Sequence, residues 1–165
     1  MKRKYNAQMA MSAIELLREN IPNVKFTTDI IVGFPGESEE TFLETEAFAR
    51  EAGFLMMHVF PYSKRSGTPA AEMSGQLDNS VKKSRVARLG AVGKEIRSGL
   101  LDRALERSDA VEVLFEDYKD GYAYGHTDNF FEVRVKSDRP LRSEFHKVRF
   151  ISHDGETLDA DLISE

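Results

Sequence analysis

Apolar side chains recur at helical spacing in three segments of the first two-thirds of the chain, which predicts helices over residues 6–19, 38–52 and 78–107. Two mostly apolar runs, residues 24–32 and 54–60, lie between these segments and predict strands of a parallel sheet that is buried on both faces. The order helix, strand, helix, strand, helix is a βαβ half-unit with flanking helices. It is too small to close a (β/α) barrel or to complete a doubly wound sheet.

The period of the pattern changes to two from Ala110 onward, which predicts strands in place of helices. Turn-forming pairs such as Asp120-Gly121 and Asp154-Gly155 separate the apolar runs. Five short strands in so short a segment indicate a small antiparallel β-barrel. The predicted strands span residues 110–117, 122–126, 130–136, 144–151 and 157–163. The predicted fold class is α/β, with domains over residues 1–107 and 108–165.

The balance of charge changes at the same place. The chain has a net charge of −5, but residues 1–107 carry 16 Lys and Arg against 14 Asp and Glu, a net of +2. Residues 108–165 carry 7 against 14, a net of −7. This asymmetry supports two units with different surfaces.

The composition excludes several classes of protein and site. Of the 165 residues, 41% are hydrophobic and 31% charged, which favours a buried core over wholesale disorder. No uncharged stretch approaches the ~20 residues of a membrane span, and we expect a cytoplasmic protein. The sequence has no cysteine, so these residues alone form no disulfide, thiol nucleophile or cysteine-ligated cluster. The four histidines show no ligand spacing, and no metal site is expected.

The turn after the first predicted strand is the first candidate site. Gly33 and Gly36 would let a ligand approach the backbone closely, and the helix start beyond them offers free N–H groups. Ligands of parallel α/β sheets bind at this end of the strands. The residues leave a second interpretation open, in which Pro35 and Gly36 serve only the geometry of a tight turn.

Cations gather in two further segments. The loop after the second strand places Lys64 and Arg65 beside Phe60 and Tyr62, which suits a nucleotide or an RNA phosphate. The alternative makes the two aromatic residues part of the core and the two cations a solvated turn. The long helix carries a basic run, which either attracts phosphates or forms a solvated face opposite the apolar stripe. That run consists of Lys82, Lys83, Arg85, Arg88, Lys94 and Arg97.

The predicted barrel is a candidate nucleic-acid surface, because small five-stranded barrels bind oligonucleotides through aromatic and basic side chains. The candidate residues are Tyr122, Tyr124, His126, Phe130, Arg134 and Lys136. The net charge of −7 argues against strong nonspecific affinity for RNA. Binding there would be selective for shape, or would work together with the basic helix.

Taken together, these segments resemble the tRNA methylthiotransferases of the radical S-adenosylmethionine class. Residues 1–5, 28–37, 58–70 and 81–85 carry the resemblance in the family's order, and the final barrel is similar to a TRAM domain. The wording of residues 58–65 most resembles the branch that acts on N6-threonylcarbamoyladenosine. The sister branch, which acts on N6-isopentenyladenosine, usually has proline where Lys64 stands.

The resemblance implies a carboxyl-terminal fragment, formed by the last part of a radical-SAM partial (β/α) barrel and a TRAM-like barrel. In the family, cysteines in the preceding part hold two [4Fe-4S] clusters; this chain would bind neither and is expected to be inactive alone. The parent would use S-adenosylmethionine to install a methylthio group at C2 of the modified adenosine beside the anticodon. The expected partners are the tRNA anticodon arm and the missing amino-terminal part of the same polypeptide.

The resemblance also assigns residues to two surfaces and identifies no catalytic residue. The residues expected to line S-adenosylmethionine are Arg3, Ile31, Gly33, Phe34, Pro35, Gly36, Glu37, Phe60 and Tyr62. The residues expected to contact RNA are Lys64, Arg65, Lys82, Lys83, Arg85, Tyr124, His126, Arg134 and Lys136.

Two other functions remain open at this point. The chain is either such a fragment, a freestanding RNA-binding module, or a small α/β scaffold whose glycine turn is structural. Within the first interpretation, N6-isopentenyladenosine remains the alternative substrate.

Overall fold

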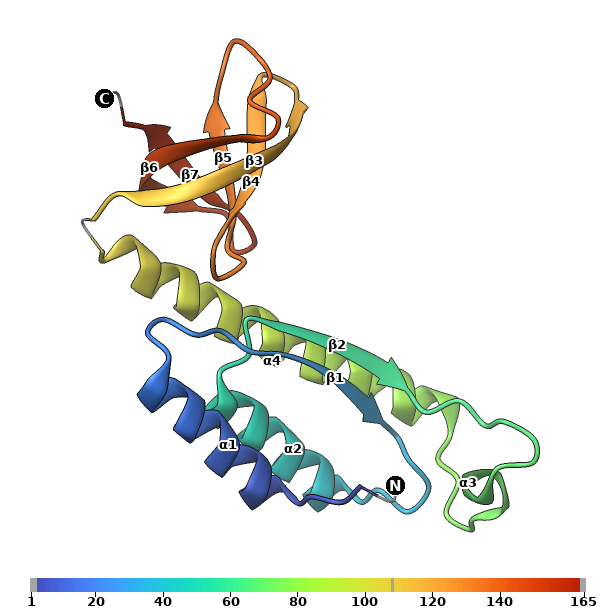
Figure 1. The fold of residues 1–165 in the computed structure, drawn as a ribbon. Coiled ribbons are helices and arrows are strands. Elements are labelled where there is room, and N and C mark those ends of the chain that lie inside the picture. The colour runs from blue at the N-terminus through green and yellow to red at the C-terminus, as the bar shows by residue number, and fades with distance from the viewer. Residues whose placement is uncertain (1–2, 108, 164–165) are drawn as a thin grey trace. The chain divides into compact units, whose positions relative to one another are not determined.

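The computed structural model describes residues 3–107 and 109–163 (Figure 1). The chain divides into two compact units, Met1–Ile96 and Arg97–Glu165. The boundary falls inside the long helix α4, Asn79–Leu105, so that the last turns of α4 belong to the second unit. The domain limits at residues 107 and 108 stay a prediction.

The first unit has the predicted order of helices and strands, with one addition. Its elements are α1 (Ala7–Asn20), β1 (Thr27–Val32), α2 (Glu39–Ala52), β2 (Met56–Pro61), α3 (Pro69–Glu72) and the first part of α4. The pattern did not predict α3, a single turn that begins at a proline, which is well tolerated at the first helical position. The strands β1 and β2 are parallel, with Ile31 opposite Phe60.

Local signals explain where the helices begin and end. The side chain of Asn6 accepts a hydrogen bond from the backbone N–H of Met9, at 2.9 Å, and caps α1. Ser38 caps α2 in the same way through Thr41 N–H, at 3.2 Å. Gly53 ends α2 with a left-handed φ of 58°. These two limits agree with the helix predicted over residues 38–52.

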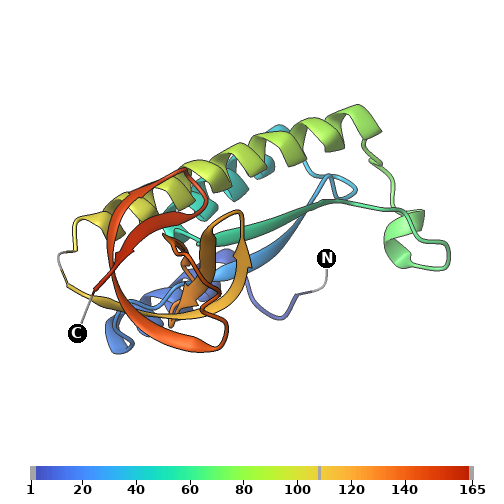
Figure 2. The ribbon, with the colours of Figure 1, turned by 90° about the horizontal axis from the view of Figure 1, so that it is seen from above.

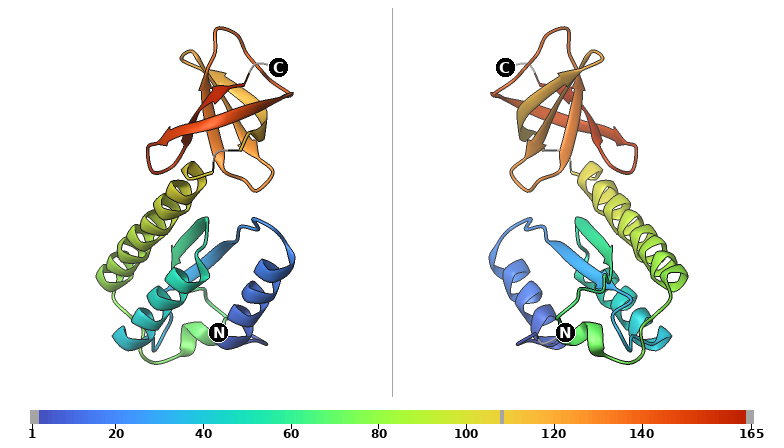
Figure 3. Two further views of the ribbon diagram at one scale, coloured as in Figure 1. Left: turned by 90° about the vertical axis from the view of Figure 1, so that its left-hand side faces the viewer. Right: turned by 90° about the vertical axis from the view of Figure 1, so that its right-hand side faces the viewer.

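The core of the first unit lies between the sheet and its helices (Figure 3). Val32, Phe42 and Leu89, from β1, α2 and α4, are fully buried in it. The prediction that both faces of the sheet are buried is wrong, because the helices of this unit cover only one. Exposed residues alternate along both strands and form what we call the open face: Asp29, Ile31, Met56, His58 and Phe60.

The second unit contains the predicted five strands as a closed barrel (Figure 2). Their order around the barrel is β3-β4-β5-β7-β6. They span β3 (Val111–Lys119), β4 (Tyr122–Thr127), β5 (Glu132–Lys136), β6 (Glu144–His153) and β7 (Leu158–Leu162). The barrel is not wholly antiparallel, since β5 and β7 pair in parallel. In a closed ring with an odd number of strands, directions cannot alternate all the way round. At least one parallel pair is therefore required.

The barrel is built on alternation and tight turns. Phe115, Val133, Val148 and Leu158 point inward and are fully buried. Asp120 and Gly121, with φ of 52° and 81°, form the two-residue connection of β3 and β4, as their sequence predicts. Gly125 lies where a Cβ would stand 2.2 Å from the carbonyl oxygen of Leu114, so no larger residue fits.

The last turns of α4 are tied to the barrel within the second unit. Leu101 and Ala104 are buried. Arg97 donates a 2.6 Å hydrogen bond to the carbonyl of Glu156, and Asp102 lies 2.9 Å from His153 Nε2. These contacts explain why the unit boundary precedes Arg97.

Candidate cofactor and nucleic-acid surfaces

The loop of residues 33–37, here called the glycine loop, closes on itself. Gly33 and Gly36 have φ of 73° and 83°, a region that glycine adopts without strain. Gly33 N–H donates to the Glu37 carboxylate at 2.6 Å, and Glu37 N–H donates to the carbonyl of Phe34 at 2.9 Å. The loop therefore has a defined shape before any ligand binds.

Arg85 of α4 fixes the position of the glycine loop through two hydrogen bonds to Glu37. Its guanidinium donates to the Glu37 carboxylate at 2.5 Å and to the Glu37 carbonyl at 3.1 Å. Arg85 is buried and Glu37 is mostly buried, with exposed side-chain fractions of 6% and 13%. The bond to Gly33 and the pair with Arg85 give Glu37 an intramolecular role.

Lys82 covers Gly33. A Cβ at Gly33 would lie 2.5 Å from Lys82 Cγ, so the close approach at this glycine is made by the protein itself. The Lys82 ammonium lies 5.3 Å from the centre of the Tyr62 ring. Lys82 is 8% exposed and Arg85 is 5% exposed. Burial gives these two predicted RNA contacts a role in the core of the unit and argues against direct contact with a phosphate.

Arg88, further along the basic run, differs from both sequence interpretations because it is paired with acidic residues. Arg88 lies 2.5 Å from Glu39 and 3.4 Å from Glu46, so this part of the helix pairs with α2. Hydrogen bonding to Arg88 lowers the pKa of Glu39 below its usual value. The acidic residues at the start of α2 were a signal for this pairing that the sequence analysis did not use. Lys83, in contrast, is exposed.

A candidate ligand surface remains in front of the glycine loop. Apart from Gly36 and its two chain neighbours, no atom of the described residues lies within 4 Å of the position that a Cβ at Gly36 would take. Ile31 and Phe60 of the open face are 39% and 49% exposed, and they face one another in register. Phe34 and Tyr62 pack edge to face at 5.3 Å. The structure thus brings these predicted cofactor residues to one end of the sheet.

Tyr62 carries the clearest sign of a missing partner on this surface. Its hydroxyl is buried, and within the described part of the chain it has no hydrogen-bond partner. A buried hydroxyl without a partner is costly, and a bound ligand is one way to satisfy it. The interpretation of Tyr62 as an inert core residue leaves this atom unexplained.

The remaining predicted residues of the first unit lie on the surface. Arg3, Lys64 and Arg65 are exposed, and Pro35 is buried within the glycine loop. The Arg65 carbonyl accepts a 2.8 Å hydrogen bond from the Thr68 hydroxyl, which gives the basic loop a local turn. These positions leave both cations available to solvent or to a phosphate.

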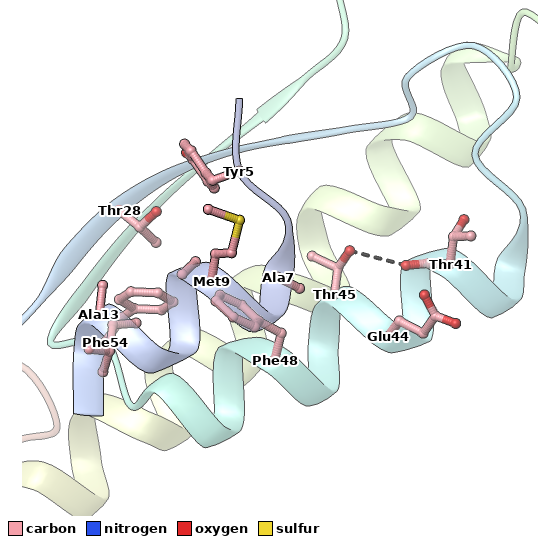
Figure 4. A pocket seen from close by; sticks show the side chains of 12 residues that line it. Tyr5, Ala7, Met9, Ala13, Thr28, Thr41, Glu44, Thr45, Phe48 and Phe54 are labelled. Atoms are coloured by element: carbon pink, nitrogen blue, oxygen red, sulfur yellow. Dashed lines mark hydrogen bonds between the residues drawn. The ribbon is translucent and has the colours of Figure 1, made fainter. Parts of the chain in front are cut away.

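A hollow that the sequence did not reveal lies beside β1, between α1 and α2 (Figure 4). We call it the edge hollow; its volume is about 680 Å³. Tyr5, Met9, Phe48 and Phe54 give it a mostly apolar lining. Thr28 of β1 also lines it, and among the described strands β1 pairs with β2 alone, so its other edge carries no strand.

The barrel places four predicted RNA residues, Tyr124, His126, Arg134 and Lys136, on neighbouring strands. Tyr122 pairs with Lys136, and Tyr124 pairs with Arg134. We call the surface formed by Tyr122, Tyr124, Arg134 and Lys136 the basic–aromatic face; it does not include His126. Arg134 is held in place by Asp159, at 2.6 Å, and by Asp154, at 3.0 Å. Hydrogen bonding to Asp159 raises the pKa of Arg134, which stays charged.

His126, on the same strand as Tyr122 and Tyr124, has acidic and aromatic neighbours instead of basic ones. Its Nδ1 is 2.6 Å from the Glu116 carboxylate, and its ring lies 6.4 Å from that of Phe130. The structure thus divides the predicted barrel surface into a basic–aromatic part and an acidic part that contains His126 and Phe130.

The described residues contain neither a metal-binding group nor a membrane-spanning helix. Within residues 3–107 and 109–163, no three His, Asp or Glu side chains come together as a metal site requires. The sequence has no cysteine for an iron–sulfur cluster. In the part of the chain that the structure describes, no helix is long and apolar enough to cross a membrane.

Comparison with known proteins gives a consistent result. No family model matches the chain. It is 39% identical over 155 residues to the threonylcarbamoyladenosine tRNA methylthiotransferase MtaB of Bacillus subtilis, a match that covers 92% of this chain and 34% of that protein. It is 43% identical over 170 residues to the tRNA-2-methylthio-N(6)-dimethylallyladenosine synthase of Acetivibrio thermocellus, covering 99% and 34%.

A third relative adds to these two. The synthase of the same name from a Thermoanaerobacter species is 45% identical over 117 residues, 70% of this chain and 24% of that protein. The chain spans about a third of the length of the first two relatives. On identities of this size over nearly all of its residues, the chain belongs to the tRNA methylthiotransferase family.

Proposed function

We propose that the chain forms the carboxyl-terminal part of a radical S-adenosylmethionine tRNA methylthiotransferase, active in the cytoplasm. The observation that carries this proposal is the identity to two such enzymes over 92% and 99% of the chain, which takes in both units. The first unit would supply part of the cofactor surface and the barrel would hold the tRNA anticodon arm.

The residues in front of the glycine loop fit an adenosyl group. Gly36 leaves room at the backbone, Ile31 and Phe60 offer exposed apolar surface, and the Tyr62 hydroxyl lacks a partner among the described residues. S-Adenosylmethionine, when bound beside an iron–sulfur cluster, supplies the radical chemistry of this class. Glu37 and Arg85 would keep the glycine loop in its conformation. The cysteine ligands of both clusters would come from elsewhere in the polypeptide.

Two exposed groups of residues suit the RNA. Lys64 and Arg65 lie on the loop that follows β2, and the basic–aromatic face offers stacking surface with fixed cations. β1 and β2 are parallel, and ligands of parallel sheets bind at the carboxyl ends of the strands. The loop with Lys64 and Arg65 follows the carboxyl end of β2, so we expect it to lie beside the cofactor.

The edge hollow suits the expected amino-terminal part of the same polypeptide. In the described residues β1 pairs only with β2, so its other edge carries unpaired backbone groups. A parallel strand before α1 would reach β1 by a right-handed crossover and lie along that edge. Its side chains would then fill the edge hollow.

We propose N6-threonylcarbamoyladenosine as the substrate. Support comes from Lys64, which stands where the sister branch usually has proline, and from the 39% identity to an enzyme named for that nucleoside. The other relatives described above are named for the dimethylallyl nucleoside, which remains the second candidate.

A chimera tests the proposal directly. The chain replaces the matching third of the Bacillus subtilis enzyme in cells that lack it, and mass spectrometry of tRNA nucleosides reports 2-methylthio-N6-threonylcarbamoyladenosine. We expect the product to return, and Tyr62→Phe to reduce it more than the control Tyr118→Phe, whose hydroxyl bonds to Ser137 in the barrel. A folded, abundant chimera without methylthiolated product would contradict the proposal. A methylthiolated dimethylallyl nucleoside instead would overturn the substrate assignment alone.

A further inference from the structure

A second hollow lies on the outside of the barrel and contains none of the residues of the basic–aromatic face. We call it the barrel hollow; its volume is about 610 Å³. It is formed by β3, β4, β6 and the turn after β4. Its lining is Glu112, Leu114, Glu116, His126, Thr127, Asp128, Phe130 and Phe145.

Phe130 is held in an unusual position at this hollow. Its φ of 65° is left-handed, a conformation that is costly for any residue with a large side chain, and its side chain is 75% exposed. Buried Thr127 enforces this geometry: its carbonyl accepts from Phe130 N–H at 3.0 Å, and its hydroxyl accepts from Phe131 N–H at 3.0 Å. Neither exposure nor backbone geometry favours phenylalanine here, so its phenyl group needs another explanation.

Apolar surface continues from Phe130 across the strands. Phe145 of β6 is 64% exposed and lies opposite Leu114 of β3, which in turn lies opposite His126 of β4. Exposed aromatic side chains that flank a hollow are typical of binding surfaces, where they act as anchors.

The rim of the hollow is acidic. Glu112, Glu116 and Asp128 contribute carboxylates, while Lys147 lies opposite Glu112 and His126 contacts Glu116. Residues 108–165 as a whole carry a net charge of −7. Such a rim repels phosphate and attracts Lys and Arg side chains.

We infer that the barrel hollow binds a basic peptide segment of a partner protein. An apolar side chain of the segment inserts between Phe130 and Phe145, and flanking Lys or Arg side chains pair with the rim carboxylates. This inference goes beyond the proposed function and does not depend on it, because the basic–aromatic face and the glycine loop take no part.

The probe is a synthetic peptide, acetyl-Lys-Arg-Leu-Phe-Arg-Lys-amide, titrated into the 15N-labelled chain of 165 residues. A peptide in which glutamate replaces every lysine and arginine is the matched control. We expect amide shifts at Leu114, Phe130 and Phe145 with the basic peptide only. Doubling the salt concentration should weaken the binding.

Variants separate binding from folding. Phe130→Gly removes the phenyl group and relieves the left-handed strain, so we expect an unchanged or higher melting temperature and binding that is weaker by about tenfold or more. Glu112→Gln with Glu116→Gln should also weaken binding, while Ile151→Ala, which removes an exposed barrel side chain outside the hollow, should not.

Two results would overturn the inference. One is the absence of shifts at the hollow at millimolar peptide, or shifts that Phe130→Gly leaves unchanged. The other is an anticodon stem-loop that shifts the same amides and loses affinity in Phe130→Gly, because the hollow would then be an RNA surface.

Discussion

Burial decides what individual cations of this protein can do. Lys82, Lys83 and Arg85 are close in sequence and equal in charge, yet only Lys83 is exposed. Arg85 is 5% exposed and holds the Glu37 carboxylate, which itself accepts from Gly33. A single buried ion pair thus links α4 to the glycine loop.

Removing Arg85 should therefore damage the first unit. Arg85→Ala leaves the mostly buried Glu37 carboxylate without its cation, and we expect a loss of about 3–5 kcal/mol in the free energy of unfolding. Chemical denaturation followed by circular dichroism measures this loss. Lys83→Ala is the control and should stay within about 0.5 kcal/mol of the parent. Equal effects of both variants would show that the pair is not structural.

The two glycines of the loop should respond differently to alanine. At both positions alanine meets a left-handed φ, which costs about 1–2 kcal/mol. At Gly33 the new Cβ would also lie 2.5 Å from Lys82 Cγ, whereas at Gly36 no described atom beyond its two chain neighbours lies within 4 Å. Thermal unfolding should therefore rank Gly33→Ala as the less stable variant. Gly90→Ala, in the middle of α4 with open space around it, should raise stability by about 1 kcal/mol.

The sequence predicted the place of the candidate site better than the roles of its residues. Glycines after a strand indicated the loop, and aromatic residues beside Lys64 and Arg65 indicated the neighbouring turn. The roles of Arg85 and Lys82 depend on partners far earlier in the chain, such as Glu37 and Tyr62, which local spacing does not reveal. The barrel hollow was equally hidden, because it depends on which strand lies beside which.

At the scale of elements, periodicity predicted the strands and all the described helices but α3 within a few residues. The helix start at Ser38 and the turn at Asp120 and Gly121 depend on local signals, which is why the sequence could predict them. Burial of the sheet on both faces was wrong, because it depends on what covers β1 and β2, and their own residues do not determine that. The parallel pair of β5 and β7 follows from the odd number of strands, a property of the closed barrel.

The barrel should lose stability in acid. Hydrogen bonds from Arg139 and then His146 lower the pKa of Glu144 to about 2, from an ordinary value of 4.5. A carboxylate with a lowered pKa in the folded state contributes stability that is present above the ordinary value and is lost as the pH falls through about 2. The pKa values of Asp117, Asp154 and Asp159 are lowered as well, so the same direction applies to them.

The Glu144 contribution is measured by comparing variants across this range. Between pH 5 and pH 2 the melting temperature of the barrel should fall, and Glu144→Gln should make the fall less steep. Glu106→Gln removes an exposed carboxylate outside this group of ion pairs and should leave the slope as it is. Identical slopes for the parent and Glu144→Gln would contradict the assigned ion pair.

At the scale of the whole molecule, the number of Lys and Arg residues overstates how many cations are available to RNA, because several are paired with carboxylates. The chain has 23 Lys and Arg, but Arg85, Arg88, Arg134 and Arg139 are engaged by carboxylates. Among the residues predicted to contact RNA, the exposed cations are Lys64, Arg65, Lys83 and Lys136. A net charge of −5 further weakens any nonspecific attraction. We therefore expect tRNA binding that uses few ionic contacts and depends on stacking by Tyr122 and Tyr124.

This expectation has a quantitative form. Four phosphate contacts to a largely single-stranded anticodon loop give a slope of about −3 in a plot of log affinity against log salt concentration. The double variant Lys64→Ala with Arg65→Ala should reduce the magnitude of the slope by about 1.4. Tyr124→Ala should lower the affinity at every salt concentration and leave the slope unchanged. Fluorescence anisotropy with a labelled anticodon stem-loop measures both effects, and Lys147→Ala beside the acidic barrel hollow is the matched control. A slope near zero in the parent would exclude the phosphate contacts, and a slope several times steeper would mean that buried or paired cations such as Arg85 become available when RNA binds.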